Sequence, residues 1–451
     1  TEFNMSKEKF TQGPILGSLV KFTLPIFFSM LLQSLYGAVD VIVVGQFSLP
    51  DSISAVTTGS QFIHMILMLI AGLCVGTTVV IGQKIGAQKP EEARDVIGST
   101  IWLYTIITIL FTFVMVFFAP HIARRIQTPP EAFKQTVKYI RISGYGVVFL
   151  IAYNVFGAVF RGFGDSKTPL IAVIIATVLN ILGDLLLVAV CNMGAVGAAI
   201  ATVFAQAVSV GVSLFIVQKR GFSFSRKNMV LNSRIVIKIL KFGAPVAIQN
   251  GLIQISFLAI TAIVNTLGVI ISAGVGITER MISFLMLSQM SFGEALSSFS
   301  AHNVGAKKYS RAKKGLFYTL FVSISIGTLI ACLAFFYGDV LLKVFTRDKA
   351  VLAVSYEYLK AYSFDVVSTA ILFCFVGYFN GLGKTRFVMW QGIIGSIMVR
   401  IPLSYIFAQQ IPVSLFKIGL AIPISSFLED ILCIVYFFIV QKKLKDKESL
   451  A

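Results

Sequence analysis

Apolar residues follow one another in twelve runs, separated by short polar segments that are rich in Lys and Arg. Each run holds roughly 20 or more residues, the length that an α-helix needs to cross the hydrocarbon core of a bilayer. The pattern therefore predicts an all-α membrane protein. The expected spans lie near residues 15–45, 53–81, 95–119, 134–160, 168–190, 195–218, 235–266, 270–300, 314–337, 354–380, 385–408 and 415–441.

Short motifs of the first half return in the second half at a spacing near 220 residues. The pairs join 21–25 with 241–245, 83–87 with 302–306, 161–164 with 380–383, and 196–200 with 418–422. Each copy holds six spans, an even number, so both copies enter the membrane in the same sense. The sequence thus predicts two pseudo-symmetric six-helix bundles, related by an axis along the membrane normal, as in transporters built from parallel repeats.

The repeat and the charge runs between spans suggest a division of the chain. We expect an N-terminal tail over 1–14, with Thr1 to Asn4 resembling a cloning remnant before a natural start at Met5. A first lobe of six spans covers 15–220, a cytoplasmic linker 221–234, a second lobe 235–441 and a cytoplasmic tail 442–451.

Composition supports a membrane location and excludes other classes of protein. Hydrophobic residues make up 57% of the chain and charged residues only 13%, whereas soluble domains carry about 25% charged residues. A net charge of +18 would suggest nucleic-acid binding in a soluble protein, but here the cations sit in short loops. No nucleic-acid partner is expected.

The distribution of those cations predicts the orientation of the chain. Twelve spans place both termini on one side, and that side carries 26 Lys and Arg against ten on the other. Short loops rich in Lys and Arg stay in the cytoplasm. We therefore expect a multi-pass protein of the bacterial inner membrane, a monomer, with both termini cytoplasmic.

Cysteine and histidine give no sign of catalysis or of a structural metal. The five cysteines are odd in number and scattered, mostly within apolar runs, which favours small buried side chains. The chain offers no His cluster, Ser/Lys dyad or phosphate-binding loop. We expect no enzymatic activity and no cofactor.

Acidic residues inside spans need a reason, because an ionised side chain at mid-bilayer costs roughly 2.5–3.5 kcal/mol. The first half holds Asp40, Asn180 and Asp184, and the repeat serves as an internal control. The matching positions carry Ile260, Arg400 and Ser404. A carboxylate needed only for packing would be expected in both copies. This asymmetry predicts a cation site in the first half.

Helical spacing supports such a site. Asn180 and Asp184 are four residues apart and share a helix face, as do Tyr36 and Asp40, and Asn154 and Thr202 are expected neighbours. Two carboxylates with amide and hydroxyl oxygens suit a hard cation such as Na⁺. The same pair could instead bind a proton, because burial and like charge favour protonation. Both interpretations stay open.

Other polar positions are candidates for lining a substrate cavity. Glu279 and Arg280 are adjacent, so they do not face each other on a helix, and Asp365 offers a second ionisable group. The full set of candidate cavity residues is Gln33, Gln249, Gln254, Glu279, Arg280 and Asp365.

With these motifs the sequence resembles the multidrug and toxic compound extrusion (MATE) family over essentially its whole length. The resemblance rests on the twelve spans, the six-plus-six repeat, Gln-Lys-Ile-Gly-Ala at 83–87, His-Asn-Val-Gly-Ala at 302–306, Arg-Gly at 161–162, Asn-Gly at 380–381, and the segment 292–306. It implies a V-shaped pair of lobes and antiport of Na⁺ or H⁺ against organic, often cationic, drugs.

The resemblance also implies site residues. The branch with a cation site in the first lobe is matched by Tyr36, Asp40, Asn154, Asn180, Asp184 and Thr202. The chain departs from the branch with acids in spans seven and ten, since it has Gln249, Asn250 and Gln254 where that branch has a Glu, and Asp365 is offset. Two alternatives stay open: an exporter dedicated to one metabolite or peptide toxin, and a flippase for lipid-linked saccharides.

Overall fold

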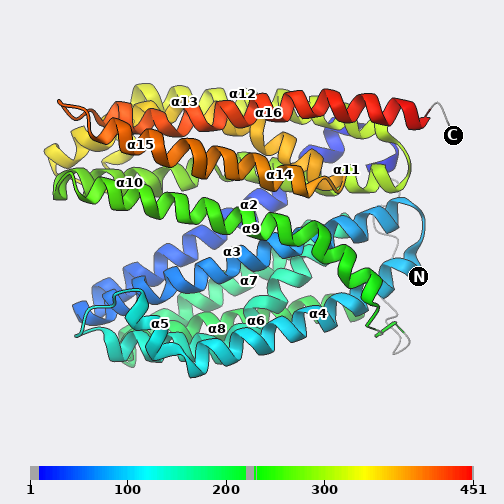
Figure 1. Ribbon diagram of the computed structural model, residues 1–451. Coiled ribbons are helices and arrows are strands. Elements are labelled where there is room, and N and C mark those ends of the chain that lie inside the picture. Colours follow the sequence, from blue (N-terminus) through cyan, green and yellow to red (C-terminus); the bar gives the residue numbers. More distant parts are fainter. Residues whose placement is uncertain (1–9, 220–227, 230, 449–451) are drawn as a thin grey trace. The chain divides into compact units, whose positions relative to one another are not determined.

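The computed structural model describes residues 10–219, 228–229 and 231–448, and these residues form helices without a β-strand (Figure 1). Within this described part, eleven helices are long and apolar enough to cross a membrane, or twelve if one bent pair counts as a single span. The all-α membrane fold predicted from the apolar runs is confirmed. Most of the expected linker 221–234, and residues 1–9 of the expected tail, lie outside the described residues.

Contacts divide the chain into two compact units. The first unit contains Leu24–Ala247 and the second contains Phe10–Thr23 together with the chain from Ile248 onward. Two helices therefore belong to both units: the first turns of α2 (Ile15–Phe47) lie in the second unit, and the first turns of α9 (Ser233–Asn265) lie in the first. The division into lobes at 15–220 and 235–441 stays a prediction.

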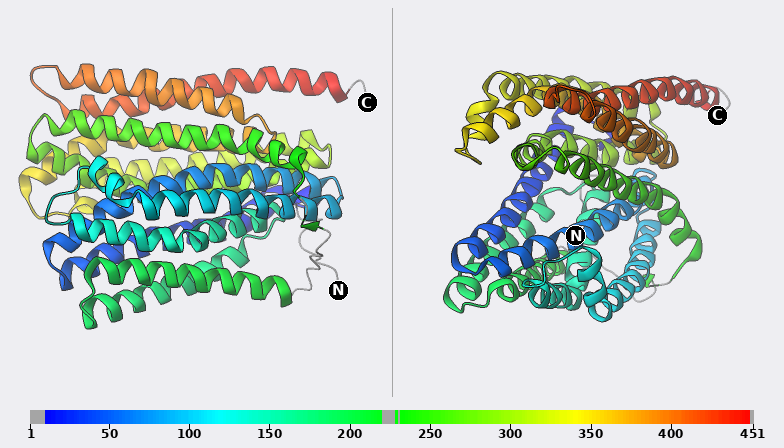
Figure 2. Two further views of the ribbon diagram at one scale, coloured as in Figure 1. Left: turned by 60° about the horizontal axis from the view of Figure 1, so that its bottom comes forward. Right: turned by 60° about the vertical axis from the view of Figure 1, so that its left-hand side comes forward.

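The first unit is a bundle in which α3 packs against α6, and α7 against α8, along much of their lengths (Figures 1 and 2). Besides α2 and α9, its elements are α3 (Pro50–Gly86), α4 (Pro90–Phe117), α5 (Ala119–Arg125), α6 (Phe133–Gly162), α7 (Lys167–Asp184), the π-helical segment η1 (Leu185–Val190) and α8 (Gly194–Lys219).

In the second unit α13 lies at the centre and contacts α10, α11, α12 and α16. Its elements are α10 (Val269–Leu285), α11 (Leu287–Gly305), α12 (Tyr309–Leu342), α13 (Lys349–Gly381), α14 (Thr385–Ile393), the π-helical segment η3 (Ile394–Arg400), α15 (Ile401–Ala408) and α16 (Leu415–Glu448). α16 extends past the predicted end of the last span at 441.

The eighth span differs from its predicted form. The apolar run 270–300 predicts one helix, but the structure has α10 and α11, bent by 41° at a break. Just beyond the break, the Ser291 hydroxyl donates to the Ser288 carbonyl oxygen at 2.7 Å. A hydropathy pattern registers neither such a local hydrogen bond nor the break.

Two repeat-related glycines explain why the motifs at 161–164 and 380–383 recur. A Cβ atom on Gly162 of α6 would lie 2.8 Å from Cβ of Ile81 on α3. A Cβ atom on Gly381 of α13 would lie 2.6 Å from the carbonyl oxygen of Ser297 on α11. Both glycines therefore permit the same close helix approach, which places the two copies of the repeat in matching packing arrangements.

Candidate cation-binding site

Four of the predicted residues come together inside the first unit. Asp40 lies on α2, Asn180 and the terminal residue Asp184 lie on α7, and Thr202 lies on α8. Asp40 is 7% exposed, Asn180 2% and Asp184 fully buried. Three helices thus direct polar side chains to one buried point.

The contacts between these side chains link all three helices. Thr202 donates from its hydroxyl to Oδ2 of Asp40 at 3.3 Å, and Asn180 donates from Nδ2 to the Thr202 hydroxyl at 3.4 Å. The carboxyls of Asp40 and Asp184 are close enough to interact with each other. Two acids therefore meet without a basic side chain among their described partners.

Four oxygen atoms of this cluster are buried without a hydrogen-bond partner among the described residues. They are Oδ1 of Asp40, Oδ1 of Asn180 and both carboxyl oxygens of Asp184. Buried polar atoms are normally paired, and an unpaired charge is costly. Oxygen acceptors that converge without a donor fit a hard monovalent cation or a shared proton. A cluster of three or more His, Cys, Asp or Glu side chains, as a transition metal would need, is absent from the described residues.

The backbone around Asp184 is specialised. A Cβ atom on Gly183 would lie 2.9 Å from Cβ of Ala201, so this glycine lets α7 approach α8 next to Asp184 and Thr202. Immediately after Asp184 the helix continues as η1, and π-helical turns within α-helices are frequent at functional sites. The acid therefore lies where the helical hydrogen-bond register changes.

Of the other two residues predicted for this site, Tyr36 interacts with Asp40, whereas no described contact joins Asn154 to the acids. Tyr36 accepts a hydrogen bond at 3.3 Å from Nε2 of Gln206, a buried residue that the sequence analysis missed. Gln206 follows Thr202 by one helical turn, so i,i+4 spacing could have identified it. Gln33, which was predicted as a cavity residue rather than as part of this site, donates to the hydroxyl of Tyr153 at 2.9 Å. Asn154 donates to the carbonyl of Leu150 in its own helix, and this contact does not join it to the acids.

The candidate cavity residues of the second unit differ in burial and in their contacts. Gln249 is buried and packs on Gly392, where a Cβ atom would lie 2.4 Å from its Nε2. Gln254 is partly exposed. Glu279 has a buried carboxyl oxygen without a hydrogen-bond partner among the described residues, whereas Arg280 is exposed.

Asp365 instead belongs to a second buried polar cluster, which differs from the first by containing a cation. Its neighbours include Arg400 at the end of η3 and Glu429 on α16. Arg400 donates from Nε to the Ser425 hydroxyl at 3.1 Å, and its guanidinium carbon lies 5.3 Å from the ring centroid of Phe257. Asp430 accepts a hydrogen bond from Ser368.

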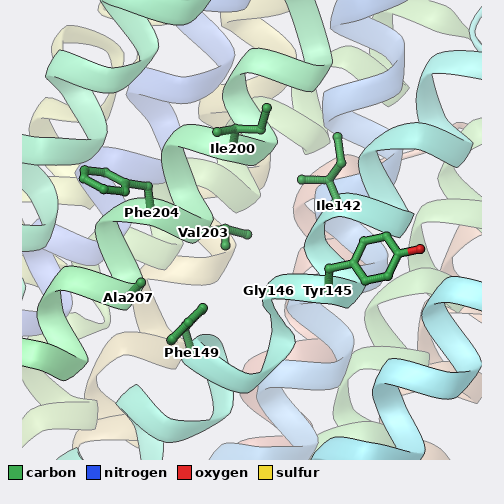
Figure 3. A pocket seen from close by; sticks show the side chains of 8 residues that line it. All are labelled: Ile142, Tyr145, Gly146, Phe149, Ile200, Val203, Phe204 and Ala207. Carbon is green, nitrogen blue, oxygen red and sulfur yellow. The ribbon is translucent and has the colours of Figure 1, made fainter.

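An apolar pocket of about 410 Å³ lies between α6 and α8 (Figure 3). Tyr145 and Phe204 stand at its rim and are 66% and 57% exposed. Val203 of α8 packs directly on Gly146 of α6: a Cβ atom on this glycine would lie 2.3 Å from a methyl carbon of the valine. An exposed apolar surface of this kind is what a lipid-facing wall presents.

A bundle of membrane-spanning helices built twice in parallel is the architecture of one class of membrane transporter. The MatE family model matches residues 25–186 and 245–406, two segments that begin 220 residues apart, and the chain belongs to this family. The family and the relatives found are transporters. The predicted repeat and the resemblance to the MATE family are thereby confirmed.

Similar proteins extend over nearly the whole chain. "Probable multidrug resistance protein YpnP" of Bacillus subtilis is 28% identical over 96% of this chain and 97% of its own length. "Probable multidrug resistance protein YoeA" of the same organism is 24% identical over 97% of this chain and 96% of its own. The solved structure "Crystal structure of MATE in complex with MaL6" matches with a TM-score of 0.91 at 20% identity, covering 97% of this chain and 99% of that one.

Proposed function

We propose that this protein is an antiporter that exports organic, cationic compounds in exchange for Na⁺ or H⁺ by alternating access. The names of the similar proteins support multidrug export. The observation that carries the ion coupling is the acid pair of Asp40 and Asp184: three of its four carboxyl oxygens are buried without a hydrogen-bond donor, and the pair has no basic partner among the described residues. A cation or proton from outside the protein would supply the missing partner.

The placement of Asp40 suggests how ion binding reaches the substrate. Asp40 lies on α2, the helix whose first turns, up to Thr23, belong to the second unit and whose remainder belongs to the first. Pro25 lies inside this helix just beyond the division, and an internal proline removes a backbone hydrogen bond and bends the helix. An ion that draws Asp40 toward Asp184 on α7 therefore acts on a helix shared by both units.

Coupling further requires that the ion and the substrate prefer different states of the protein. In the proposed cycle, ion binding at the outward-open stage weakens substrate binding, the substrate leaves, and the ion is released inside. A ligand with equal affinity for both states would shift nothing, however tightly it bound. The energy of the gradient reaches the substrate only through this difference.

Location and assembly follow the same proposal. The excess of Lys and Arg on the side of the termini supports cytoplasmic termini in a bacterial inner membrane. The protein acts as a monomer in this account, because each chain carries both copies of the bundle and one complete acid pair.

Transport of a fluorescent organic cation into proteoliposomes, under separate Na⁺ and pH gradients, tests this function. Wild-type protein should transport under at least one gradient, and Asp40→Asn or Asp184→Asn should reduce gradient-driven transport at least tenfold, because a neutral amide cannot replace the carboxylate. Asp365→Asn, which neutralises an acid outside the site, serves as the matched control and should retain gradient dependence. If Asp184→Asn, reconstituted as monodisperse protein in the same amount, transports under the gradients as the wild type does, the proposal is refuted.

A further inference from the structure

The repeat places the same turn at two points of the chain. We call residues 87–95 the first turn; they comprise the connection between α3 and α4 and the start of α4. Residues 306–314 are the second turn and comprise the connection between α11 and α12 and the start of α12. Gln88 and Lys307 occupy matching positions, and both have a φ angle of 59°, in the left-handed region. The two turns therefore share a backbone, and differences in their side chains are informative.

The first turn neutralises its own cations. Glu92 pairs with Lys84 and, at 2.6 Å, with Lys89. Glu91 pairs with Arg94 at 2.8 Å. The remaining acid, Asp95, accepts a hydrogen bond from Asn228. Every acid in this turn thus has a partner within the protein, and the turn presents little net charge.

The second turn has lost all three acids. Ser310, Arg311 and Lys314 stand where the first turn has Glu91, Glu92 and Asp95. Residues 306–314 carry five cations and no acid, and the next acid along the chain is Asp339. The charge that the first turn balances is left unbalanced in the second.

Four of these five cations line a pocket of about 350 Å³ in the second unit. Its lining consists of Ile15, Lys307–Arg311 and Lys314. α12 begins at Tyr309 without a side-chain cap, so the positive end of a long helix adds to the field of the lysines. The pocket therefore combines four cationic side chains with a helix start, and no described acid lines it.

Two of the four cations are held in place by backbone rather than by acids. Arg311 donates to the carbonyl oxygens of Phe10, Gln12 and Gly13 at 2.8–2.9 Å, and Lys308 donates to that of Thr11 at 2.9 Å. The buried ring of Phe10 anchors this segment against Phe299 and His302. Hydrogen bonds therefore hold Lys308 and Arg311 in the wall of the pocket. Lys307 and Lys314, in contrast, are exposed and make no ion pair with a described acid.

The surroundings distinguish a lipid from a soluble anion. One turn beyond Lys314, α12 presents Phe317 and Tyr318, and two turns beyond it Phe321, which are 51%, 46% and 73% exposed. These residues lie on the same helix face as Lys314 and begin the apolar surface of a membrane span. The pocket thus opens where polar headgroups border acyl chains.

We propose that this pocket binds the phosphate group of an anionic membrane lipid, with the acyl chains lying along the aromatic face of α12. Lys307 and Lys314 contact the phosphate, and Lys308 and Arg311 fix the wall. Basic pockets at the ends of membrane-spanning helices recognise headgroups through this chemistry. The site is independent of the acid pair in the first unit, so it stands or falls separately from the proposed ion coupling.

Native mass spectrometry of the full chain, titrated with phosphatidylglycerol or phosphatidylcholine, tests the proposal. The wild type should bind phosphatidylglycerol in preference, and K307Q/K314Q should bind it roughly tenfold or more weakly, given the contribution of each cation near an anionic headgroup. The matched control K89Q/R94Q removes two cations from the first turn and should keep wild-type affinity. Equal affinity in K307Q/K314Q and wild type would overturn the proposal.

Two further measurements sharpen the result. Ser310→Glu restores the acid that the first turn has at this position and should suppress phosphatidylglycerol binding, because the pocket then holds its own anion. Thermal unfolding in detergent, with inorganic phosphate in place of lipid, measures whether a soluble anion stabilises the protein as phosphatidylglycerol does. Stabilisation by phosphate equal to that by phosphatidylglycerol, or undiminished lipid binding by Ser310→Glu, would contradict a lipid site.

Discussion

Positions 180 and 400 correspond in the repeat, yet the first unit has Asn180 there and the second has Arg400. In the first unit, Asp40 and Asp184 face each other with buried oxygens that lack a described partner. In the second, Asp365 and Glu429 are near enough to Arg400 to interact with its positive charge. The polar cluster of the second unit therefore contains a cationic side chain, Arg400. The cluster of the first unit contains acids but no cationic side chain among its described partners.

Under the proposed function, this difference distinguishes a structural polar cluster from a site that exchanges an ion. A guanidinium cannot leave, and in proteins it stays protonated, so the second cluster keeps this positive charge throughout a transport cycle. The acids of the first cluster can be neutralised only by something that comes and goes. We therefore expect substitutions of Asn180 to change the ion dependence of transport and substitutions of Arg400 to change the stability of the second unit.

The largest effect is expected when the first cluster is given a fixed cation. Asn180→Arg places a guanidinium beside Asp40 and Asp184, where paired hydrogen bonds to carboxylate would replace the exchangeable ion. Gradient-driven transport should fall at least tenfold in proteoliposomes. Asn180→Gln is the control, since it adds length while keeping the amide, and should lose no more than about threefold from overpacking. Gradient-driven transport that persists in Asn180→Arg would break the comparison.

A smaller effect, on stability rather than coupling, is expected from the reverse exchange. Arg400→Asn leaves buried acids without their cation, and removing one member of a buried charge group costs about 3–5 kcal/mol. The midpoint of thermal unfolding in detergent should fall, and Arg400→Asn/Asp365→Asn should recover part of the loss. Arg280→Asn removes the same charge from an exposed position and should change stability little. If Arg400→Asn unfolds at the same temperature as Arg280→Asn, the guanidinium does not stabilise this cluster.

Hydropathy and the internal repeat predicted most of the fold. The break between α10 and α11 was not predicted. The sequence on both sides of Met286 is apolar, and the backbone hydrogen bonds of a helix are not visible in composition. The π-helical segment η1 escaped for the same reason, since Leu185–Val190 reads like any apolar helix. The shared membership of α2 and α9 depends on long-range contacts that spacing along one helix does not encode.

The candidate site shows the same limit at the scale of residues. Helical spacing on α7 was sufficient to pair Asn180 with Asp184, and the repeat showed that Asp40 and Asp184 have no acidic counterparts in the second half. Contacts between helices are another matter: Thr202 was included as an expected neighbour, Gln206 one turn later was missed, and the amide of Asn154 bonds within its own helix. The basic residues near 307–314 served only to predict orientation, because a pocket requires side chains that are distant in sequence.

Direct measurement of ion binding tests the central claim most closely. Purified wild type, Asp184→Asn and Asp365→Asn can be compared by equilibrium binding of radioactive Na⁺ and by proton uptake with a pH indicator. The account predicts a saturable signal for one of these ions in the wild type, its loss in Asp184→Asn and its retention in Asp365→Asn. Undiminished binding in Asp184→Asn, or loss in Asp365→Asn alone, would contradict it.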